Sequence, residues 1–398
     1  VARPAEGFLG WPPLVAAALA MAAVAVYVLA TAFPGAGSRL LGRWLPLALA
    51  WLIFIQPTGL ELTGSWLGWP ADPTWQGQWR SDPTVMQSLE REIRPADPGG
   101  AGDFLLARQA ADGPFRYVGY GGMAYPGDTA RQANYMERRF DPGVQAILVN
   151  GRPMLLGLDE IQGYDPIELA RYAEFMRALN GADQNYHTAY LLASGTGSPL
   201  LDLLDVRYAL VDAALPQDRP DVVALANGGR KAFANDHVIV YERQPDARRA
   251  WIVHDVRPAG RDNPLAPIAD GTVDPFRTAF VEGAPPAVAA ATGPETATVT
   301  RDDGDAISVD VTATAPGLLV LSEPYASGWL ATIDGKPAPI LPADLLLRGV
   351  PIPAGEHRVE LRYAPAPLRI GLAISAVAGA AMLAAFAWAG WRRFHSPA

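Results

Sequence analysis

Cysteine is absent from the 398 residues of this chain, which excludes disulfides, thiol nucleophiles and thiolate metal sites. Lysine occurs only at Lys231 and Lys336, and the net charge is -9, so no basic surface can neutralise nucleic-acid phosphates. The glycine-rich segment 194–198 lacks the lysine of a phosphate-binding loop. Metal-ligand spacing is also missing among the five histidines, His187, His237, His254, His357 and His395. We therefore expect no cofactor, while use of a divalent cation stays open.

Long apolar runs are plentiful, in contrast. Half of the residues are hydrophobic and 18% are charged, a mixture typical of a membrane-anchored protein with a large water-soluble part. A helix needs about 20 apolar residues to cross a bilayer. This length predicts transmembrane helices at 14–33, at about 40–57 (a weaker pattern) and at 368–391, where the uncharged core is Ile370–Trp391.

Arginines beside these runs predict their orientation. Arg392 and Arg393 follow the last helix, and Arg39 and Arg43 lie in the link between the first two. The positive-inside rule places both groups in the cytoplasm. Residues 392–398 then form a cytoplasmic tail, and the long region between the second and third helices faces outward from the bacterial cytoplasmic membrane.

This topology puts the N-terminus outside, with no targeting signal ahead of the first apolar run. We therefore expect the chain from Val1 to be the C-terminal portion of a longer multi-pass protein with further transmembrane helices upstream. A signal peptide is the alternative, since Ala30-Thr31-Ala32 has the form of a cleavage site. Small residues share one face of the last helix, which favours close helix packing or is incidental in an alanine-rich sequence, at Gly371, Ser375 and Gly379.

Two folded units are predicted between the membrane helices. Residues 59–256 alternate helix and strand patterns, which predicts an α/β or α+β domain. Its clearest helix is expected to begin at Asp165-Pro166, with Asp165 and Glu168 as a capping box, and to end at Asn180-Gly181. Strand patterns occupy Val206–Val211, His237–Tyr241 and Trp251–Val253.

Residues 257–275 are rich in proline, glycine and aspartate and are predicted to form a linker. Residues 276–365 then show strand patterns alone, including a hairpin signal at Asp334-Gly335. Roughly eight short strands at this spacing predict a β-sandwich or jelly roll. The expected fold class is therefore an integral membrane protein with about three transmembrane helices, an α/β (α+β) outer domain and an all-β sandwich domain.

Several motifs in a fixed order resemble one bacterial family. They are GYDPIELARYAEF (163–175), LLDLLDVRYALV (200–211), HVIVYER (237–243), RRAWIVHDV (248–256), LLVLSEPYASGWLATIDGKPAPIL (318–341) and RGVPIPAGEHRVELRYAP (348–365). Together with the terminal apolar helix they closely resemble the C-terminal end of the YfhO-like membrane proteins, over about residues 80–391. Arg248 departs from this pattern, because such proteins more usually show proline before the arginine that corresponds to Arg249.

The resemblance implies a lipid-linked-sugar glycosyltransferase that acts on cell-envelope glycans at the outer leaflet. In such enzymes the acidic catalytic residue lies on an early outer loop, which would precede Val1, so no catalytic residue is carried onto this chain. The partners it implies are the lipid bilayer, a lipid-linked sugar and a cell-envelope glycan. No nucleic acid is expected among them.

The sequence pattern alone suggests few site residues. Glu61 is a weak candidate for a base or metal ligand, and Trp66 and Trp69 could stack on sugar rings. An aromatic belt at the membrane interface is the simpler interpretation of these tryptophans. Trp329 and Asp334 are candidates for sugar binding on the sandwich, with core packing and turn formation as their simpler roles.

Two charged residues have structural explanations. Capping accounts for Asp165 without catalysis. Arg207, inside a strand, is expected to pair with Asp202 or Asp205. The leading hypothesis is an outer module that binds an acceptor polymer or lipid-linked sugar near the membrane. The alternative is a non-catalytic envelope scaffold or interaction protein.

Overall fold

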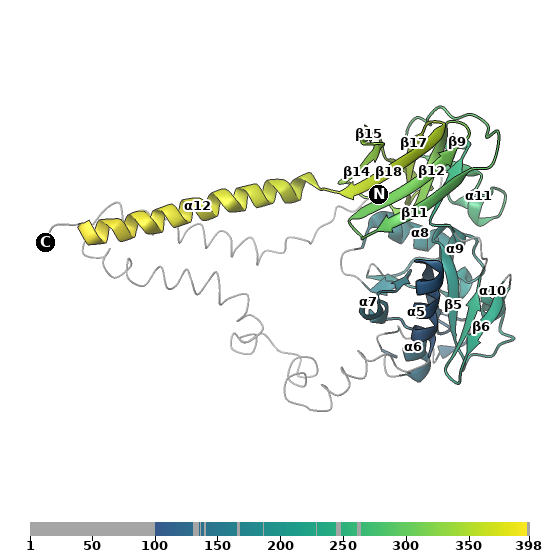
Figure 1. The fold of residues 1–398 in the computed structure, drawn as a ribbon. Coiled ribbons are helices and arrows are strands. Elements are labelled where there is room, and N and C mark those ends of the chain that lie inside the picture. The colour runs from purple at the N-terminus through teal and green to yellow at the C-terminus, as the bar shows by residue number, and fades with distance from the viewer. Residues whose placement is uncertain are drawn as a thin grey trace, which may run out of the picture. The chain divides into compact units, whose positions relative to one another are not determined.

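The computed structural model describes residues 100–395, with gaps at 130–134, 136, 139–140, 165–167, 186, 228, 244–247 and 261–263. The chain divides into two compact units, Val1–Glu90 and Arg91–Ala398, and the described residues belong to the second. The predicted helices at 14–33 and 40–57 lie outside the described residues. Figure 1 shows a half that mixes helices and strands, a half made mostly of strands, and the long C-terminal helix α12.

The mixed half is built on a five-stranded sheet in the order β2-β1-β5-β7-β6. The first three of these strands run parallel, and β7 is antiparallel to both β5 and β6. Their bounds are β1 (Arg116–Tyr120), β2 (Asp159–Glu160), β5 (Val206–Asp212), β6 (Arg230–Ala234) and β7 (Val238–Glu242). The strands predicted at 206–211 and 237–241 are thus confirmed to within a residue.

Helices cover both faces of this sheet because its central strand is apolar on both sides. In β5, Tyr208 and Leu210 enter one hydrophobic cluster, and Ala209 and Val211 enter another. The surrounding elements are α5 (Ala101–Asp112), α6 (Pro142–Ala146), α7 (Arg152–Leu156), α8 (Ala170–Asn180), η3 (Ala193–Gly195), α9 (Leu200–Leu203) and α10 (Pro220–Ala226), with a small antiparallel pair, β3 (Gly163–Tyr164) and β4 (Thr188–Ala189).

Helix α8 begins later than predicted. Its N-cap is Leu169, which makes no side-chain cap bond, so the expected capping box of Asp165 with Glu168 is wrong. Glu168 precedes the helix and lines a cavity instead, and Asp165 lies outside the described residues. The predicted end is confirmed, since Gly181 follows the helix in the left-handed region at φ 64°.

The second half is a sandwich of two sheets. One has the order β8-β13-β17-β16-β10-β9 and the other β11-β12-β18-β14-β15. The bounds are β8 (Ala250–Val253), β9 (Asp255–Pro258), β10 (Thr278–Val281), β11 (Thr296–Asp302), β12 (Ala306–Ala313), β13 (Gly317–Pro324), β14 (Trp329–Ile333), β15 (Lys336–Ala338), β16 (Leu341–Ala343), β17 (Leu347–Ile352) and β18 (Gly355–Tyr363). A hydrophobic cluster fills the space between the sheets, as a sandwich requires.

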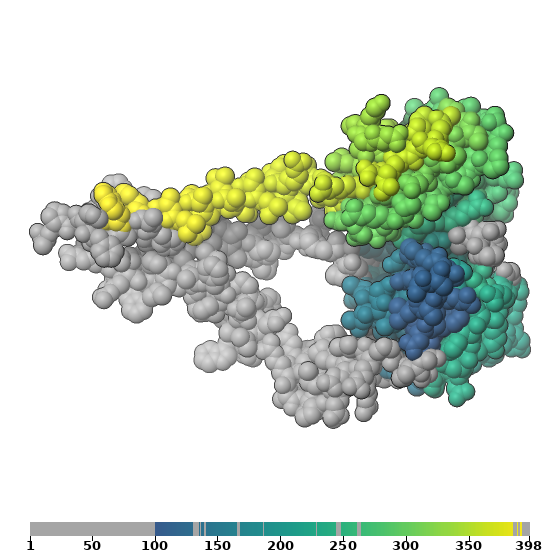
Figure 2. All heavy atoms as spheres, in the orientation of Figure 1, coloured from purple at the N-terminus to yellow at the C-terminus, as the bar shows by residue number. Residues whose placement is uncertain are grey.

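The segment expected as a linker is part of the folded core. Residues 257–275 contain α11 (Ala266–Ala269), and both Leu265 and Ile268 are buried in the cluster that also holds α8. The indole Nε1 of Trp251 donates to the carbonyl of Pro275 at 3.1 Å. The segment is therefore tied down rather than free. Figure 2 shows the two halves meeting along a continuous surface.

The predicted hairpin is confirmed. Asp334 (φ 51°) and Gly335 (φ 78°) connect β14 to β15, and two positive φ values in a two-residue loop define a type I′ turn. Asp334 also accepts a hydrogen bond from the Arg358 N–H at 2.9 Å. Its carboxylate contacts His357 at 2.7 Å. The turn is thus fixed against β18.

Helix α12 (Ala366–His395) follows β18 after two residues. Within the described residues, it is the one helix long and apolar enough to cross a membrane. The segment concerned, Ala366–Ala384, has a mean hydropathy of 1.6, and none of it is buried against the rest of the protein. Space beside Gly371 and Gly379 is open among the described residues. The predicted apolar helix at 368–391 is therefore found as a helix.

The buried carboxyl of Asp344 should make the stability of the protein depend on pH. It is fully buried, and its Oδ1 accepts the Phe280 N–H at 2.8 Å. Burial raises the pKa of this carboxyl to about 7 against that hydrogen bond. Between its ordinary pKa near ~4 and about 7, the folded protein holds a proton that the unfolded chain has lost, so stability falls as pH rises through this window.

Asp344→Asn keeps the acceptor for Phe280 and cannot ionise. We expect the apparent melting temperature of the parent protein to fall more steeply between pH 4 and pH 8 than that of the variant. The upper limit of the difference is about 4 kcal/mol. Parallel curves for the two proteins in detergent would contradict this assignment.

Candidate functional site

Two cavities adjoin where the mixed half meets the sandwich. Their volumes are about 360 and 700 Å³, within the range of roughly 300–1,000 Å³ typical of ligand sites. Both cavities are lined by Arg116, Glu160, Gln162 and Gly163, so these four residues lie at the boundary between them. We refer to the pair of cavities as the junction groove.

Glu160, at the end of β2, is the acidic residue of the groove whose pKa is shifted furthest from its ordinary value. Its Oε1 accepts the backbone N–H of Gly119 at 3.3 Å and Nε2 of Gln162 at 2.6 Å, and its Oε2 accepts the Gln162 N–H at 3.2 Å. Within the part of the chain that the structure describes, no arginine, lysine or histidine forms an ion pair with it. Burial raises the pKa of the Glu160 carboxyl to about 7 although these donors oppose the shift.

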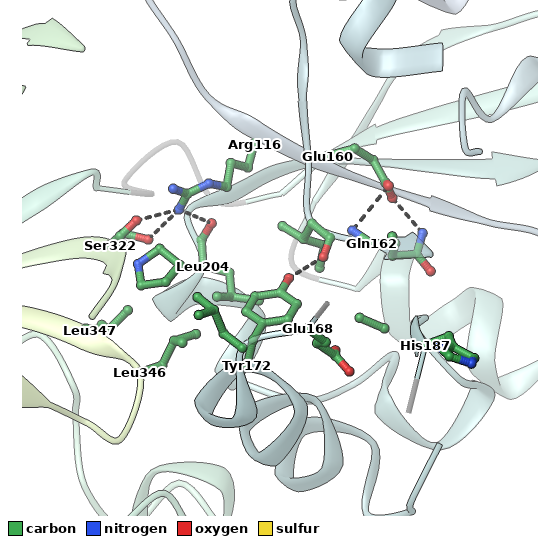
Figure 3. A pocket seen from close by; sticks show the side chains of 15 residues that line it. Arg116, Glu160, Gln162, Glu168, Tyr172, His187, Leu204, Ser322, Leu346 and Leu347 are labelled. Carbon is green, nitrogen blue, oxygen red and sulfur yellow. Dashed lines mark hydrogen bonds between the residues drawn. The ribbon is translucent and has the colours of Figure 1, made fainter. Parts of the chain in front are cut away.

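Gln162 holds this carboxyl in place. Its Nε2 also donates to the Gly119 carbonyl at 2.6 Å, and its Oε1 accepts the Leu191 N–H at 2.7 Å. No residue larger than glycine fits at position 119, because a Cβ there would lie 2.4 Å from the Ile147 carbonyl oxygen. Glu160 and Gln162 therefore form a rigid polar wall (Figure 3).

The rest of the narrower cavity is of mixed character. Tyr172 of α8 donates its hydroxyl to the Ile161 carbonyl, and Leu346 and Leu347 come from the sandwich. Glu168 and His187 lie at the other end from the leucines (Figure 3). Apolar surface with a few oriented polar groups is the usual composition of a site for a small polar ligand.

Arg116 faces away from Glu160. Its guanidinium donates to the Ser322 carbonyl and hydroxyl at 2.6 and 2.9 Å and pairs with Glu323 at 2.6 Å. The hydroxyl of Ser322 in turn donates to the Leu203 carbonyl at 2.7 Å. This arginine of β1 thus joins the mixed half to β13 of the sandwich.

Arg249 extends the same ionic network across the groove. It lies 2.9 Å from Asp302, 3.1 Å from Glu323, 3.2 Å from Asp159 and 4.0 Å from Asp205. Burial raises the pKa of Asp205 to about 6, although Arg249 and Arg116 oppose this. One guanidinium therefore bridges carboxylates that belong to both halves.

The sequence-predicted site residues do not gather in this groove. Glu61, Trp66 and Trp69 lie outside the described residues. Trp329 lies at one end of the sandwich, where the Arg348 guanidinium covers its ring at 3.7 Å, and Asp334 holds the β14–β15 turn. Neither lines the junction groove.

The predicted partners of Arg207 are wrong. Arg207 pairs with Asp112 at 2.8 Å and with Glu242 at 3.1 Å. Asp202 pairs instead with Arg243 at 3.1 Å. Arg207 therefore pairs with residues that β5–β7 pairing and the packing of α5 bring close to it, and not with its neighbours in the sequence. Glu160 and Gln162 escaped sequence reasoning because no spacing or periodicity marks them.

An apolar helix of spanning length is joined directly to a β-sandwich that packs on a mixed α/β half, which is the arrangement expected of a membrane-anchored protein with a folded polar part. Residues 288–375 match the family model described as bacterial membrane protein YfhO. The matched region covers β11 to β18 and enters α12. Over this region the chain is thus similar to the YfhO family of bacterial membrane proteins. No curated protein and no solved structure matches it.

Arg249 generates a stability prediction. Removing one partner of a buried ionic network costs about 3–5 kcal/mol because the remaining charges lose their counter-ion. We expect Arg249→Ala to lower the apparent melting temperature of the protein in detergent strongly. Arg257→Ala is the matched control, because Arg257 pairs with Asp255 at the exposed surface. Equal melting temperatures for both variants would refute the structural role of Arg249.

Proposed function

We propose that this chain is the outer part of a multi-pass glycosyltransferase-like protein of the bacterial cytoplasmic membrane, and that the junction groove holds its sugar substrate. The family match supports a bacterial membrane protein. Arg392 and Arg393 support an inward C-terminus, and with it an outer position for the mixed half and the sandwich. The chemistry belongs to residues outside the described part, and no described residue is assigned to it.

The position of the groove beside the anchor carries this proposal. Asp302 and Gly304 line the wider cavity. The carbonyl of the adjacent Asp305 accepts the Tyr363 N–H at 2.8 Å, and α12 begins at Ala366. Three extended residues span roughly 10 Å, so this edge of the cavity lies close to the point where the chain enters the bilayer. Such a position suits a substrate attached to, or built at, the membrane surface.

The charge of the groove supports a sugar rather than a phosphate as its ligand. With histidine neutral and both glutamates ionised, the lining of the narrower cavity includes Arg116, Glu160 and Glu168, a sum of 1 − 2 = −1. The wider cavity contains two arginines and four carboxylates, a sum of 2 − 4 = −2, from Arg116, Arg249, Asp159, Glu160, Asp302 and Glu323. A phosphate would be repelled, whereas hydroxyl or amine groups find acceptors.

A second candidate function is a scaffold for a partner protein in the envelope. One observation favours it, because α7 exposes Met154 and Leu155 at 84% and 59% beside the wider cavity. Exposed apolar side chains of this kind are enriched at protein interfaces. Sugar binding in the groove and partner binding at α7 are separable, since they depend on different side chains.

The test is sugar binding by the purified full chain in detergent, measured by saturation-transfer NMR with glucose, glucosamine and glucose 1-phosphate. We expect signals from the first two sugars and none from the third. Glu160→Gln should weaken binding roughly 10-fold, because an amide replaces one of the two carboxyl oxygens with a donor. Glu356→Gln, which changes an exposed carboxylate of β18, should have no effect. Preference for the phosphate, or equal binding by both variants, would overturn the proposal.

A further inference from the structure

The exit of the chain from the sandwich is held in place. The Ala364 N–H donates to the Gly328 carbonyl at 2.8 Å. Gly328 has φ 104°, and a Cβ on it would lie 3.0 Å from Cβ of Pro365. Gly328 thus packs directly on the residue before α12. The turn that leads into β14 and the start of the apolar helix are therefore neighbours.

Strand pairing carries further residues to the same end. In the β14–β18 pair, Trp329 lies opposite Tyr363 and Leu330 lies opposite Arg362. Leu330 is 59% exposed and Tyr363 is 43% exposed. Between residues 250 and 363 of the described part, these two are the large apolar side chains that are exposed. The exposed apolar surface of the sandwich is thus concentrated where the anchor begins.

The distances leave this end within reach of the polar layer of a bilayer. Arg362, opposite Leu330, is four residues before Ala366, at most roughly 14 Å along an extended chain. The headgroup layer on each side of the hydrocarbon is about 5–8 Å thick. Tyrosine and tryptophan are enriched there, because an apolar ring and a polar tip suit that layer. Leu368, in the first turn of α12, is also exposed.

We propose that Trp329, Leu330 and Tyr363 form a membrane-contact edge that rests in the headgroup layer of the bilayer. Charge does not oppose this contact. Exposed charges of both signs occur near this edge, since Arg362 lies opposite Leu330, Asp305 is bonded through its carbonyl to Tyr363, and Asp303 is paired with Arg301, so a zwitterionic lipid suffices. The ring centroids of Trp329 and Tyr363 lie 5.5 Å apart. The guanidinium carbon of Arg348 lies 3.7 Å from the centroid of the Trp329 ring. The edge is therefore a fixed surface.

This edge would hold the sandwich at one angle to the membrane. With α12 alone, the sandwich could pivot about Ala364 and Pro365. A second contact through Leu330 restricts that rotation. The inference goes beyond the proposed sugar site and does not depend on it, because it concerns lipid contact alone.

The absence of cysteine makes a direct experiment possible. Leu330→Cys in the full chain is labelled with the fluorophore NBD, and the protein is reconstituted in phosphatidylcholine vesicles. Quenching by doxyl-labelled phosphatidylcholine then reports lipid contact. Leu368→Cys in α12 is the positive control. Val223→Cys on α10, also an exposed apolar position, is the matched negative control.

We expect position 330 to show blue-shifted emission and at least a two-fold loss of fluorescence, close to position 368. Position 223 should keep its fluorescence. Position 330 behaving like position 223 while 368 is quenched would overturn the membrane-contact edge. No quenching at 368 would overturn it too, because the anchor would then not enter the bilayer. Sugar binding in detergent is unaffected by either result, so the two proposals fail separately.

Discussion

The arrangement depends on β13, a strand that is buried on both faces. Leu319 and Leu321 point into the core between the two sheets of the sandwich, whereas Leu318 and Val320 join the core shared with the mixed half. Each buried aliphatic side chain of this kind contributes about 1.5–3 kcal/mol. Since one strand belongs to both cores, the halves behave as one unit. The junction groove is the space that this joint leaves at its rim.

Charge takes over where apolar contact ends. Arg116 and Arg249 lie at the rim between β1 and β13, and both contact Glu323. Burying such a network stabilises a fold little overall, because desolvation offsets the attraction. If the halves were misaligned, however, buried charges would lose their partners, and an unpaired buried charge strongly destabilises a fold. We infer that the network selects the relative position of the halves, while the apolar core supplies most of the stability.

Local pattern was sufficient for the elements and insufficient for their assembly. Residue pattern revealed the strands at 206–211 and 237–241, and Asp334-Gly335 revealed the β14–β15 hairpin, because turn chemistry is local. Composition suggested a linker at 257–275. Proline, glycine and aspartate do indicate turns there, but they do not show whether Leu265 and Ile268 between those turns are buried. The sequence could therefore separate two units without showing that they share a core.

The groove was beyond sequence reasoning for a related reason. Glu160 owes its environment to Gly119, 41 residues earlier, and to Gln162, which is itself held by Leu191. Nothing in the local sequence distinguishes this glutamate from a solvated one. Arg116 likewise meets Glu323 across 207 residues. The family similarity over residues 288–375 gives no view of the groove, because most of the groove lies upstream of the matched region.

Short connections keep the start of the anchor close to the groove. Only Ala364 and Pro365 separate β18 from α12, and Ala364 is bonded to Gly328. The turn beside the wider cavity is bonded to Tyr363 in the same strand. A flexible linker of even ten residues would let a domain wander about 15–20 Å from its anchor. Here the strand that ends at the apolar helix is bonded to the turn that lines the groove, so the groove stays near the start of that helix.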